Sequence, residues 1–499
     1  MQVRPAVGRD ARDARRQAVV GGLCLALGAG VVAGMAVVHR PSGTPGSPST
    51  AAAGRATAAA LGAAASTRPA STPPAKDAPA GARATTARPL VAAVRIPARK
   101  ATLVVSPQGS DRNPGTAARP FATVGRAAQV ARAGDVVDVR RGVYRLASGI
   151  HLGANGTPSR RILLRAHPGE KVVLDGGRLG AGAVVVAIAG RYVDLQGFEI
   201  RGAASVGVSV WGGAHVRVVG NRIHGLRSAG VFVGYDRPGV VTDVDVSGNT
   251  VWDNSTAHAA HREGGGWGQG ISAAGTSSRV RITGNRVFHT HGEGIGVLGV
   301  GITVSGNVVH DNFAAGIYVD QGTRSTISRN LVYTTGDRAF FRFGMPSTMI
   351  QIANEGRQRP ELLTRLVISD NVLLGGRSGI GYWSSYGVGG GLRNSTITHN
   401  TLVGSSSENL LVQPDPGHRG TVVRDNLVVK RGAGRLADVP RTAGLRFRHN
   451  CWTASPPAAA ADRAGDVVAV PRFVRPGGLR ASDHRLRAGS PCAGFGARL

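Results

Sequence analysis

The residues best placed to do chemistry are two carboxylates, Asp320 and Glu355, near the ends of two segments of alternating apolar pattern. Alternation over 314–322, 348–355 and 379–386 predicts adjacent strands, with both carboxylates on one outward face of neighbouring strands. The expected separation is roughly 8 Å between backbones, at which a carboxyl pair can act as acid and as base or nucleophile on a glycosidic bond. The alternative is that both residues cap turns at strand ends.

Further candidates are expected on this face or in the loops beside it. Arg338 or Arg342 would contact an acidic sugar, and an Arg or His291 would abstract the proton in an elimination. In that elimination Asp320 and Glu355 would neutralise a uronate through Ca²⁺, so Ca²⁺ is a cofactor of this alternative alone. The residues assigned to substrate binding are Tyr318, Gln351, Trp267 and Trp383, with Trp383 as a platform for a sugar ring.

His289, His291 and Glu293 form an H-x-H-x-E motif, which would present three metal ligands if alternate strand residues shared a face. The motif lies at an expected turn, and its spacing defines no second group of ligands. A structural role is therefore favoured, and no metal site is predicted.

An asparagine recurs along the chain after an alternating strand and before an apolar pair, as in VRVVGNRIH and VDVSGNTVW. Most intervals lie in the twenties, a period typical of a solenoid whose coils must stack to bury their apolar faces. We expect each Asn to adopt a left-handed turn conformation and to hydrogen-bond along the stack. Flat rings three positions later predict a ring column, which favours structural roles for His224 and His310. The asparagines are Asn221, Asn249, Asn285, Asn307, Asn330, Asn371, Asn400, Asn426 and Asn450.

Two intervals exceed the regular coil of 22 or 23 residues, Asn249 to Asn285 by about 13 and Asn330 to Asn371 by about 18. Insertions in a solenoid emerge as loops, often on the binding face. The first contains HAAHREGGGWGQG and the second GDRAFFRFGMPSTMIQIANEGRQRP. We expect these two loops to wall a groove beside the candidate carboxylates.

A second strand follows in each coil, in the segments AGVFVG, QGISAAG, EGIGVLG, AGIYVDQG, SGIGYWSS and NLLVQPD. With these segments, residues 101–499 resemble the bacterial right-handed parallel β-helix repeat proteins, a pectate-lyase-like superfamily that includes polygalacturonases and uronate epimerases. The resemblance implies an all-β fold, a single-stranded right-handed parallel β-helix solenoid. The N-T-D, D-D and R-I-K motifs of polygalacturonases do not occur in order, and all four lysines lie outside the expected groove. The resemblance therefore selects no particular reaction.

The two ends of this region also resemble the family. Residues 101–145 are similar to its N-terminal cap, with a short helix over Pro120–Ala133, and residues 450–499 to its closing segment. Cys451 and Cys492 are predicted either to form a disulfide or to stay two buried thiols. The apolar stripe of the capping helix comprises Val124, Ala127, Ala128 and Ala131.

The N-terminal hundred residues are predicted to hold no part of the solenoid. Residues 18–38 carry no charge and are long enough to cross a bilayer, with five arginines before them. This indicates a cytoplasmic segment 1–17, a single membrane pass at 18–38, and an Ala/Pro/Thr-rich disordered linker 39–100 that places residues 101–499 outside the cell. The alternative is a cleaved signal segment and a secreted protein.

The net charge of +31 indicates a polyanionic partner. The excess is spread along the chain without a nucleic-acid recognition motif, which argues against nucleic acid and favours an acidic polysaccharide. We expect a monomeric carbohydrate-active protein, a polysaccharide lyase or glycosidase. The alternative is a non-catalytic glycan-binding or structural surface protein.

Overall fold

The computed structural model describes residues 89, 91–202, 205–235, 237–261, 267–355, 363–384, 390–439, 444–462 and 464–499. The predicted membrane segment 18–38 and nearly all of the linker 39–100 lie outside these residues.

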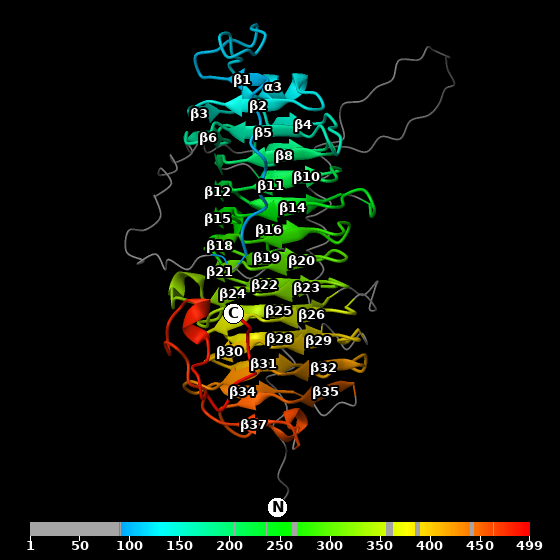
Figure 1. Ribbon diagram of the computed structural model, residues 1–499, viewed down its shortest axis with the longest axis vertical. Helices are drawn as coiled ribbons and strands as arrows, with labels where there is room; N and C mark the ends of the chain where they lie inside the picture. Colours follow the sequence, from blue (N-terminus) through cyan, green and yellow to red (C-terminus); the bar gives the residue numbers. More distant parts are fainter. Residues whose placement is uncertain are drawn as a thin grey trace, which may run out of the picture.

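The described residues form one stack of coils built from three parallel sheets, which we call sheets A, B and C (Figure 1). Each strand pairs in parallel with the equivalent strand one coil away, as the repeat predicts. Sheet A contains, in order, β1 (Leu103–Val105), β2 (Val136–Val139), β5 (Ile162–Ala166), β8 (Val193–Gln196), β11 (Arg217–Val219), β14 (Asp245–Ser247), β17 (Arg281–Thr283), β20 (Thr303–Ser305), β23 (Thr326–Ser328), β26 (Val367–Ser369), β29 (Thr396–Thr398), β32 (Thr421–Arg424) and β35 (Leu445–Arg448).

Sheets B and C complete each coil. Sheet B contains β3 (Gly142–Arg145), β6 (Val172–Asp175), β9 (Glu199–Arg201), β12 (Arg222–His224), β15 (Thr250–Trp252), β18 (Arg286–Phe288), β21 (Val308–His310), β24 (Leu331–Tyr333), β27 (Val372–Leu374), β30 (Thr401–Val403), β33 (Leu427–Val429), β36 (Cys451–Trp452) and β37 (Val467–Val468). Sheet C contains β4 (Ile150–Leu152), β7 (Val184–Ile188), β10 (Val206–Trp211), β13 (Val231–Gly234), β16 (Gln269–Ala273), β19 (Glu293–Val297), β22 (Ala315–Asp320), β25 (Thr348–Asn354), β28 (Ser378–Ser384), β31 (Glu408–Val412) and β34 (Arg435–Asp438).

The asparagines form the predicted ladder between sheets A and B. From Asn221 to Asn426, each backbone N–H donates to the side-chain oxygen of the next Asn at 2.8 to 3.1 Å. Each side-chain amide donates to the same oxygen at 2.9 to 3.0 Å. The ladder gives buried amides the partners they need, and so ties each coil to the next.

The predicted left-handed conformation belongs to the residue before each Asn, and not to the Asn itself. Gly220, Gly248, Gly284 and Gly306 have φ values of 63 to 67° and precede the first four asparagines of the ladder. In later coils non-glycine residues take that position, such as Arg329 with a φ of 53°. The physical reason is that the turn is made one residue earlier, which leaves the Asn free to extend its amide along the stack.

The ring column is confirmed. The rings of His224, Trp252, Phe288, His310 and Tyr333 stack in succession, with centroids 4.1 to 6.1 Å apart and planes within 16°. His310 is buried, and its Nδ1 lies 2.8 Å from a carboxylate oxygen of Asp311. These stacked positions account for His224 and His310 as structural residues.

The capping helix α3 (Val124–Val130) is shorter than the predicted Pro120–Ala133. Its N-cap Thr123 accepts a hydrogen bond from the Arg126 backbone, and the chain leaves the helical conformation at Ala131. The predicted apolar stripe is buried under the first coil. Short 3₁₀ turns complete the helical elements among the described residues: η1 (Thr256–His258), η2 (Arg338–Phe340), η3 (Ala458–Ala460) and η4 (Ala481–His484).

The opposite end is closed by the C-terminal segment, which Cys451 and Cys492 join to β36 through a disulfide. Cys492, Phe473 and Phe495 pack with the outer residues of sheet B. The chain then passes back along the solenoid, where Arg498 pairs with Asp370.

The structured region begins before residue 101. Residues 91–99 run along the outside of sheet A from the middle of the stack to its N-terminal cap (blue in Figure 1). The backbone N–H of Val94 donates to the Ser247 hydroxyl at 3.0 Å, and Ile96 packs against outward residues of sheet A. We call residues 91–99 the strap.

The membrane prediction is corrected. Within the described ranges, no helix has both the length and the apolar character needed to cross a bilayer. This finding does not support a single-pass membrane protein, and that localisation is not carried further.

Candidate functional site

The outer face of sheet C carries the candidate site, and the predicted register of its strands is confirmed. Asp320, the last residue of β22, pairs with Ala353 of β25, which pairs in turn with Trp383 of β28. Along each strand, the residues that alternate with these outward positions point inward and are buried. These inward positions are Ile271, Ile295, Ile317, Ile350, Ile380 and Leu410, and next to them Ala273, Val297, Val319, Ile352, Tyr382 and Val412.

The structure brings Asp320 and Glu355 into direct contact. Glu355 follows β25 immediately, two residues beyond the register partner of Asp320. Its backbone N–H donates a hydrogen bond to a carboxylate oxygen of Asp320 at 3.1 Å. The hydroxyl of Tyr318, buried on the same face, donates to the Glu355 carboxylate. Two carboxyl groups and a phenol therefore converge on one surface.

Burial alters the proton affinity of these groups. Desolvation, and then the charge of Glu355, raise the pKa of Asp320 well above its usual range. Desolvation likewise raises the pKa of Glu355, although the Tyr318 hydrogen bond and the charge of Arg342 oppose it. The pKa of Tyr318 is raised for the same reason, so it stays a neutral donor. Both shifts favour the protonated carboxyl, which is the form that a general acid requires.

Glu293 joins this group, although sequence reasoning placed it in a metal motif. It opens β19, in register with Gln269 of β16, whose amide donates to its carboxylate at 2.8 Å. Glu293 is 5% exposed, and burial followed by the charges of Glu355 and Asp320 raises its pKa to about 8. The signal in the sequence is the register: Gln269 and Glu293 occupy equivalent positions two residues before Ile271 and Ile295.

The two predicted insertions meet beside the three carboxyls of Asp320, Glu355 and Glu293. Trp267 from the first and Phe340 from the second pack around Phe313. Arg342 lies over the Trp267 ring, 5.4 Å from its centroid. Its charge reaches Glu293 and Glu355, lowering the pKa of both carboxyls against the effect of burial. The described residues of both insertions therefore pack together beside this face, and Arg342 lies among them.

The other candidates are placed less favourably. Trp267 is 7% exposed and covered by Arg342, so its ring is not open to a sugar. Arg338 is exposed on η2, and among the described residues no contact joins it to the carboxyl pair. Trp383 packs against the patch of Tyr318 and Ala353, while Gln351 pairs in register with Tyr318.

The H-x-H-x-E side chains diverge because the motif turns before β19. His289 stacks on Phe340, with centroids 4.7 Å apart, whereas His291 faces Asp253 and His261. Glu293 faces Gln269. Across the described ranges no group of three His, Cys, Asp or Glu side chains is arranged to hold a metal ion.

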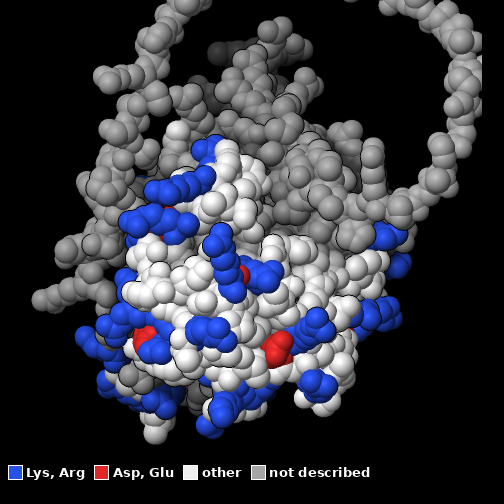
Figure 2. All heavy atoms as spheres, turned by 90° about the horizontal axis from the view of Figure 1, so that it is seen from above, with Lys and Arg blue, Asp and Glu red and all other residues white. Residues whose placement is uncertain are grey.

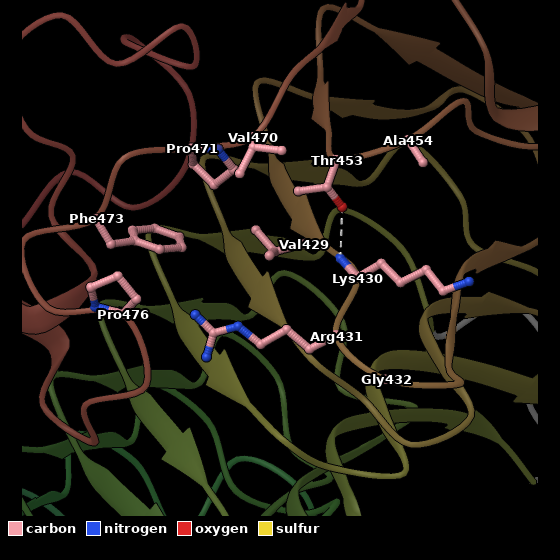
Figure 3. A pocket seen from close by; sticks show the side chains of 10 residues that line it. All are labelled: Val429, Lys430, Arg431, Gly432, Thr453, Ala454, Val470, Pro471, Phe473 and Pro476. Carbon is pink, nitrogen blue, oxygen red and sulfur yellow. Dashed lines mark hydrogen bonds between the residues drawn. The ribbon is translucent and has the colours of Figure 1, made fainter.

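A separate hollow of about 530 Å³ lies near the C-terminal end, between β33, β36 and the closing segment (Figure 3). Arg431 points toward Phe473 and Pro476, whereas Lys430 points away from them and donates its backbone N–H to Thr453. None of the predicted site residues lines it. We therefore assign the candidate site to sheet C, where the titratable groups converge.

Comparison with known proteins agrees with this architecture. The family described as Pel9A-like, right handed beta helix region matches residues 103–294, and the family described as right handed beta helix region matches 244–415. Pectate lyase PEL9 of Emericella nidulans is 39% identical over 79 residues, 16% of this chain and 19% of that protein. The uncharacterized protein YwoF of Bacillus subtilis is 30% identical over 139 residues, 25% of this chain and 29% of that protein. The chain thus spans less than a third of either relative.

Solved structures share the fold at low identity. XylC in complex with xylose superposes with a TM-score of 0.54 and 14% identity, covering 75% of this chain and 88% of that one. The GH136 lacto-N-biosidase from Eubacterium ramulus has a TM-score of 0.51 and 14% identity, covering 74% and 67%. The stacked parallel coils and the family matches together define a right-handed parallel β-helix protein. Over these parts of the chain, the sequence is similar to pectate-lyase-like β-helix proteins.

Proposed function

We propose that this protein is a carbohydrate-active enzyme that cleaves glycosidic bonds in an acidic polysaccharide at the outer face of sheet C. The observation that carries the proposal is the contact between Asp320 and Glu355, two carboxyls whose burial raises their pKa values. Paired carboxyls with different environments are the common machinery of glycosidic-bond cleavage.

The chemistry follows from the protonation of the pair. The protonated carboxyl donates its proton to the leaving glycosidic oxygen, and its ionised partner serves as base or nucleophile in a hydrolysis. In an elimination, Arg342 pairs with the uronate carboxylate and a base takes the proton from the carbon beside it. The C–H electron pair then forms the double bond as the C–O bond breaks, and the protonated carboxyl again gives its proton to the leaving oxygen. Trp383, at the edge of the same patch, offers an aromatic face to a sugar ring.

Charge supports an acidic substrate. Among the described residues, Arg342 is the cation whose charge lowers the pKa of both Glu293 and Glu355. Seen from the end that carries α3, the surface displays many Lys and Arg side chains and few acidic ones (Figure 2). The similarity to a protein named pectate lyase agrees with such a substrate, because pectate is a polyanion. The net charge of +31 adds long-range attraction for it.

The carboxyls do not fit a Ca²⁺ site as they are arranged. Ca²⁺ takes six to eight oxygen ligands, mostly ionised carboxylates and carbonyls. Here the Glu355 backbone, the Tyr318 hydroxyl and the Gln269 amide donate hydrogen bonds to Asp320, Glu355 and Glu293, and burial favours their protonated forms. We therefore derive no step through Ca²⁺.

The experiment is incubation of the full chain with a panel of acidic and neutral polysaccharides. Ultraviolet absorbance from unsaturated uronates would identify elimination, and new reducing ends without that absorbance would identify hydrolysis. Retention of a glycan without cleavage would overturn the enzymatic proposal and favour a glycan-binding protein. The control is the doubly substituted Asp320→Asn, Glu355→Gln chain.

A further inference from the structure

Three side chains beside the carboxyl group form a hydrogen-bonded chain that the proposed cleavage does not use. Asp253 Oδ1 lies 3.2 Å from Nε2 of His291, and Nδ1 of His291 lies 3.0 Å from Nε2 of His261. We call Asp253, His291 and His261 the histidine relay. Its members come from three separate points of the chain, so the tertiary structure assembles it.

Local structure holds each member of the relay in place. Asp253 follows β15 and His261 ends the described part of the first insertion, both in the left-handed region with φ of 50°. The His261 ring stacks on Phe313, with centroids 3.9 Å apart and planes 10° apart. His291 is buried on most of its side chain, whereas the Asp253 carboxylate is half exposed. A strained backbone, a ring stack and two hydrogen bonds together fix the His261 imidazole.

The order of donors and acceptors defines the tautomers. An ionised Asp253 is an acceptor, so Nε2 of His291 carries the hydrogen and Nδ1 of His291 accepts. His261 must then donate from Nε2, which leaves a lone pair on its Nδ1. Among the described residues no hydrogen bond engages that nitrogen. Such an arrangement, with a carboxylate orienting an imidazole, is the geometry of an enzymatic base.

The relay borders the carboxyl site. Phe313, under His261, packs with Trp267, and Arg342 lies over Trp267. The Gln269 amide donates both to the Trp267 carbonyl and to Glu293, which follows His291 by two residues. The aromatic cluster of Trp267, Phe313 and Phe340 thus connects the relay to the carboxyls.

We propose that His261 is a catalytic residue that accepts a proton through Nδ1, and that His291 and Asp253 are positioning residues that hold its tautomer. The inference rests on the proposed function and adds a base to it. In an elimination, the sugar C–H bond gives its proton to Nδ1, its electron pair forms the double bond as the C–O bond breaks, and the leaving oxygen takes the proton of the protonated carboxyl. In a hydrolysis in which the ionised carboxylate is the nucleophile, Nδ1 takes a proton from the water that then cleaves the glycosyl–carboxylate bond and releases the carboxylate.

The surroundings of His261 favour its neutral form. Burial, followed by the charge of His291, lowers its pKa below the usual value. The other titratable or charged groups around the aromatic cluster are His289, which lies near Asp337, and Arg342, which lies over the Trp267 ring. His258, from the first insertion, also packs on Trp267. The Asp253 carboxylate is the acidic group bonded into the relay itself. A neutral imidazole is the form that a base requires.

The first test needs no substrate: the ¹⁵N resonances of labelled histidines in the full chain, assigned with single-histidine variants. The expected spectrum shows His261 as the Nε2–H tautomer. In the Asp253→Asn chain the new amide donates to His291, so the relay reverses and His261 becomes the Nδ1–H tautomer. An Nδ1–H tautomer in the unaltered chain, or no change with Asp253→Asn, would overturn the relay.

The second test is the pH dependence of kcat/KM on the polysaccharide that the panel identifies. His261→Phe keeps a ring on Phe313 but removes the base, and is expected to lower kcat by about 10²-fold or more with loss of the acid limb. Asp253→Asn should give a comparable loss with the fold intact. His215→Phe, which alters a histidine stacked on Tyr192 in a distant coil, is the matched control and should change neither. If the unaltered chain cleaves the polysaccharide and His261→Phe has the same pH dependence of kcat/KM, His261 is not the base, and the proposed function stands. If the unaltered chain cleaves no polysaccharide, the proposed function itself is overturned.

Discussion

The backbone N–H of Glu355 donates to the side chain of Asp320 across 35 residues of sequence, and this bond joins two neighbouring coils at the outer face of sheet C. It places one carboxyl in the electrostatic field of the other, and burial prevents water from screening that field. Both effects raise the pKa of the pair, and the proposed cleavage uses the protonated carboxyl that results.

Removing either carboxyl of the pair should abolish most turnover while leaving the fold intact. Asp320→Asn and Glu355→Gln are each expected to lower kcat by about 10²- to 10⁴-fold, because a positioned acid or base contributes that much. In Asp320→Asn the new amide oxygen would still accept the Glu355 hydrogen bond, so the melting temperature should change little. Glu408→Gln, a buried glutamate further along sheet C, is the control. A large stability loss in Asp320→Asn would show that Asp320 caps a turn instead.

Glu293 should make the protein less stable as the pH rises. Its pKa is raised from 4.5 to about 8, so the folded chain binds a proton that the unfolded chain has lost over this range. Its favourable contribution is complete below pH 4.5 and is lost as the pH rises through 8. Glu293→Gln should therefore raise the melting temperature at pH 8.5 by roughly a few degrees relative to pH 5. An equal effect at both pH values, measured by calorimetry, would contradict the burial of an ionisable Glu293.

The asparagine ladder should be a principal source of stability. Asn307→Ala removes the acceptor for the backbone and side chain of Asn285, and it removes the side-chain amide that donates to Asn330 while the backbone donor remains. We expect a loss of about 2–4 kcal/mol, since buried polar groups lose partners in a connected network. Denaturant unfolding checks the value, with the exposed Asn155→Ala as control. A loss equal to that of the control would mean that the ladder adds nothing to stability.

The strap should stabilise sheet A, and it can lie against the sheet because three residues beneath it are glycines without a Cβ. A Cβ at Gly248, Gly284 or Gly306 would lie within 2.4 Å of Ala93 or Val91. Gly306→Ala should therefore displace the strap and lower the melting temperature more than Gly301→Ala. Gly301 has almost the same φ, 66° against 67°, but no neighbour within 4 Å. In a chain starting at residue 101 the two substitutions should have equal effects; a persistent difference would exclude the strap as its cause.

The sequence by itself determined the repeating parts of this protein. Inward apolar residues at equivalent positions, such as Ile295 and Ile317, and the Asn that recurs from Asn221 onward specify the coil and the ladder. The flat rings three positions after the Asn specify the ring column, because successive coils repeat one local pattern and stack on one another. The same periodicity placed Asp320 and Glu355 on one face, since register in a parallel sheet follows from the inward apolar positions.

Tertiary structure decided what lies outside the period. The left-handed residue before each Asn, the strap on sheet A and the meeting of Asp253, His261 and His291 depend on turns and insertions whose paths no repeat specifies. Glu293 shows the difference most clearly. Its motif has the residue types of a metal site, but the turn at His291 redirects the two histidines, and burial beside Asp320 and Glu355 raises the pKa of Glu293. Side-chain chemistry at such points depends on which loop covers them, and three-dimensional packing alone settles that.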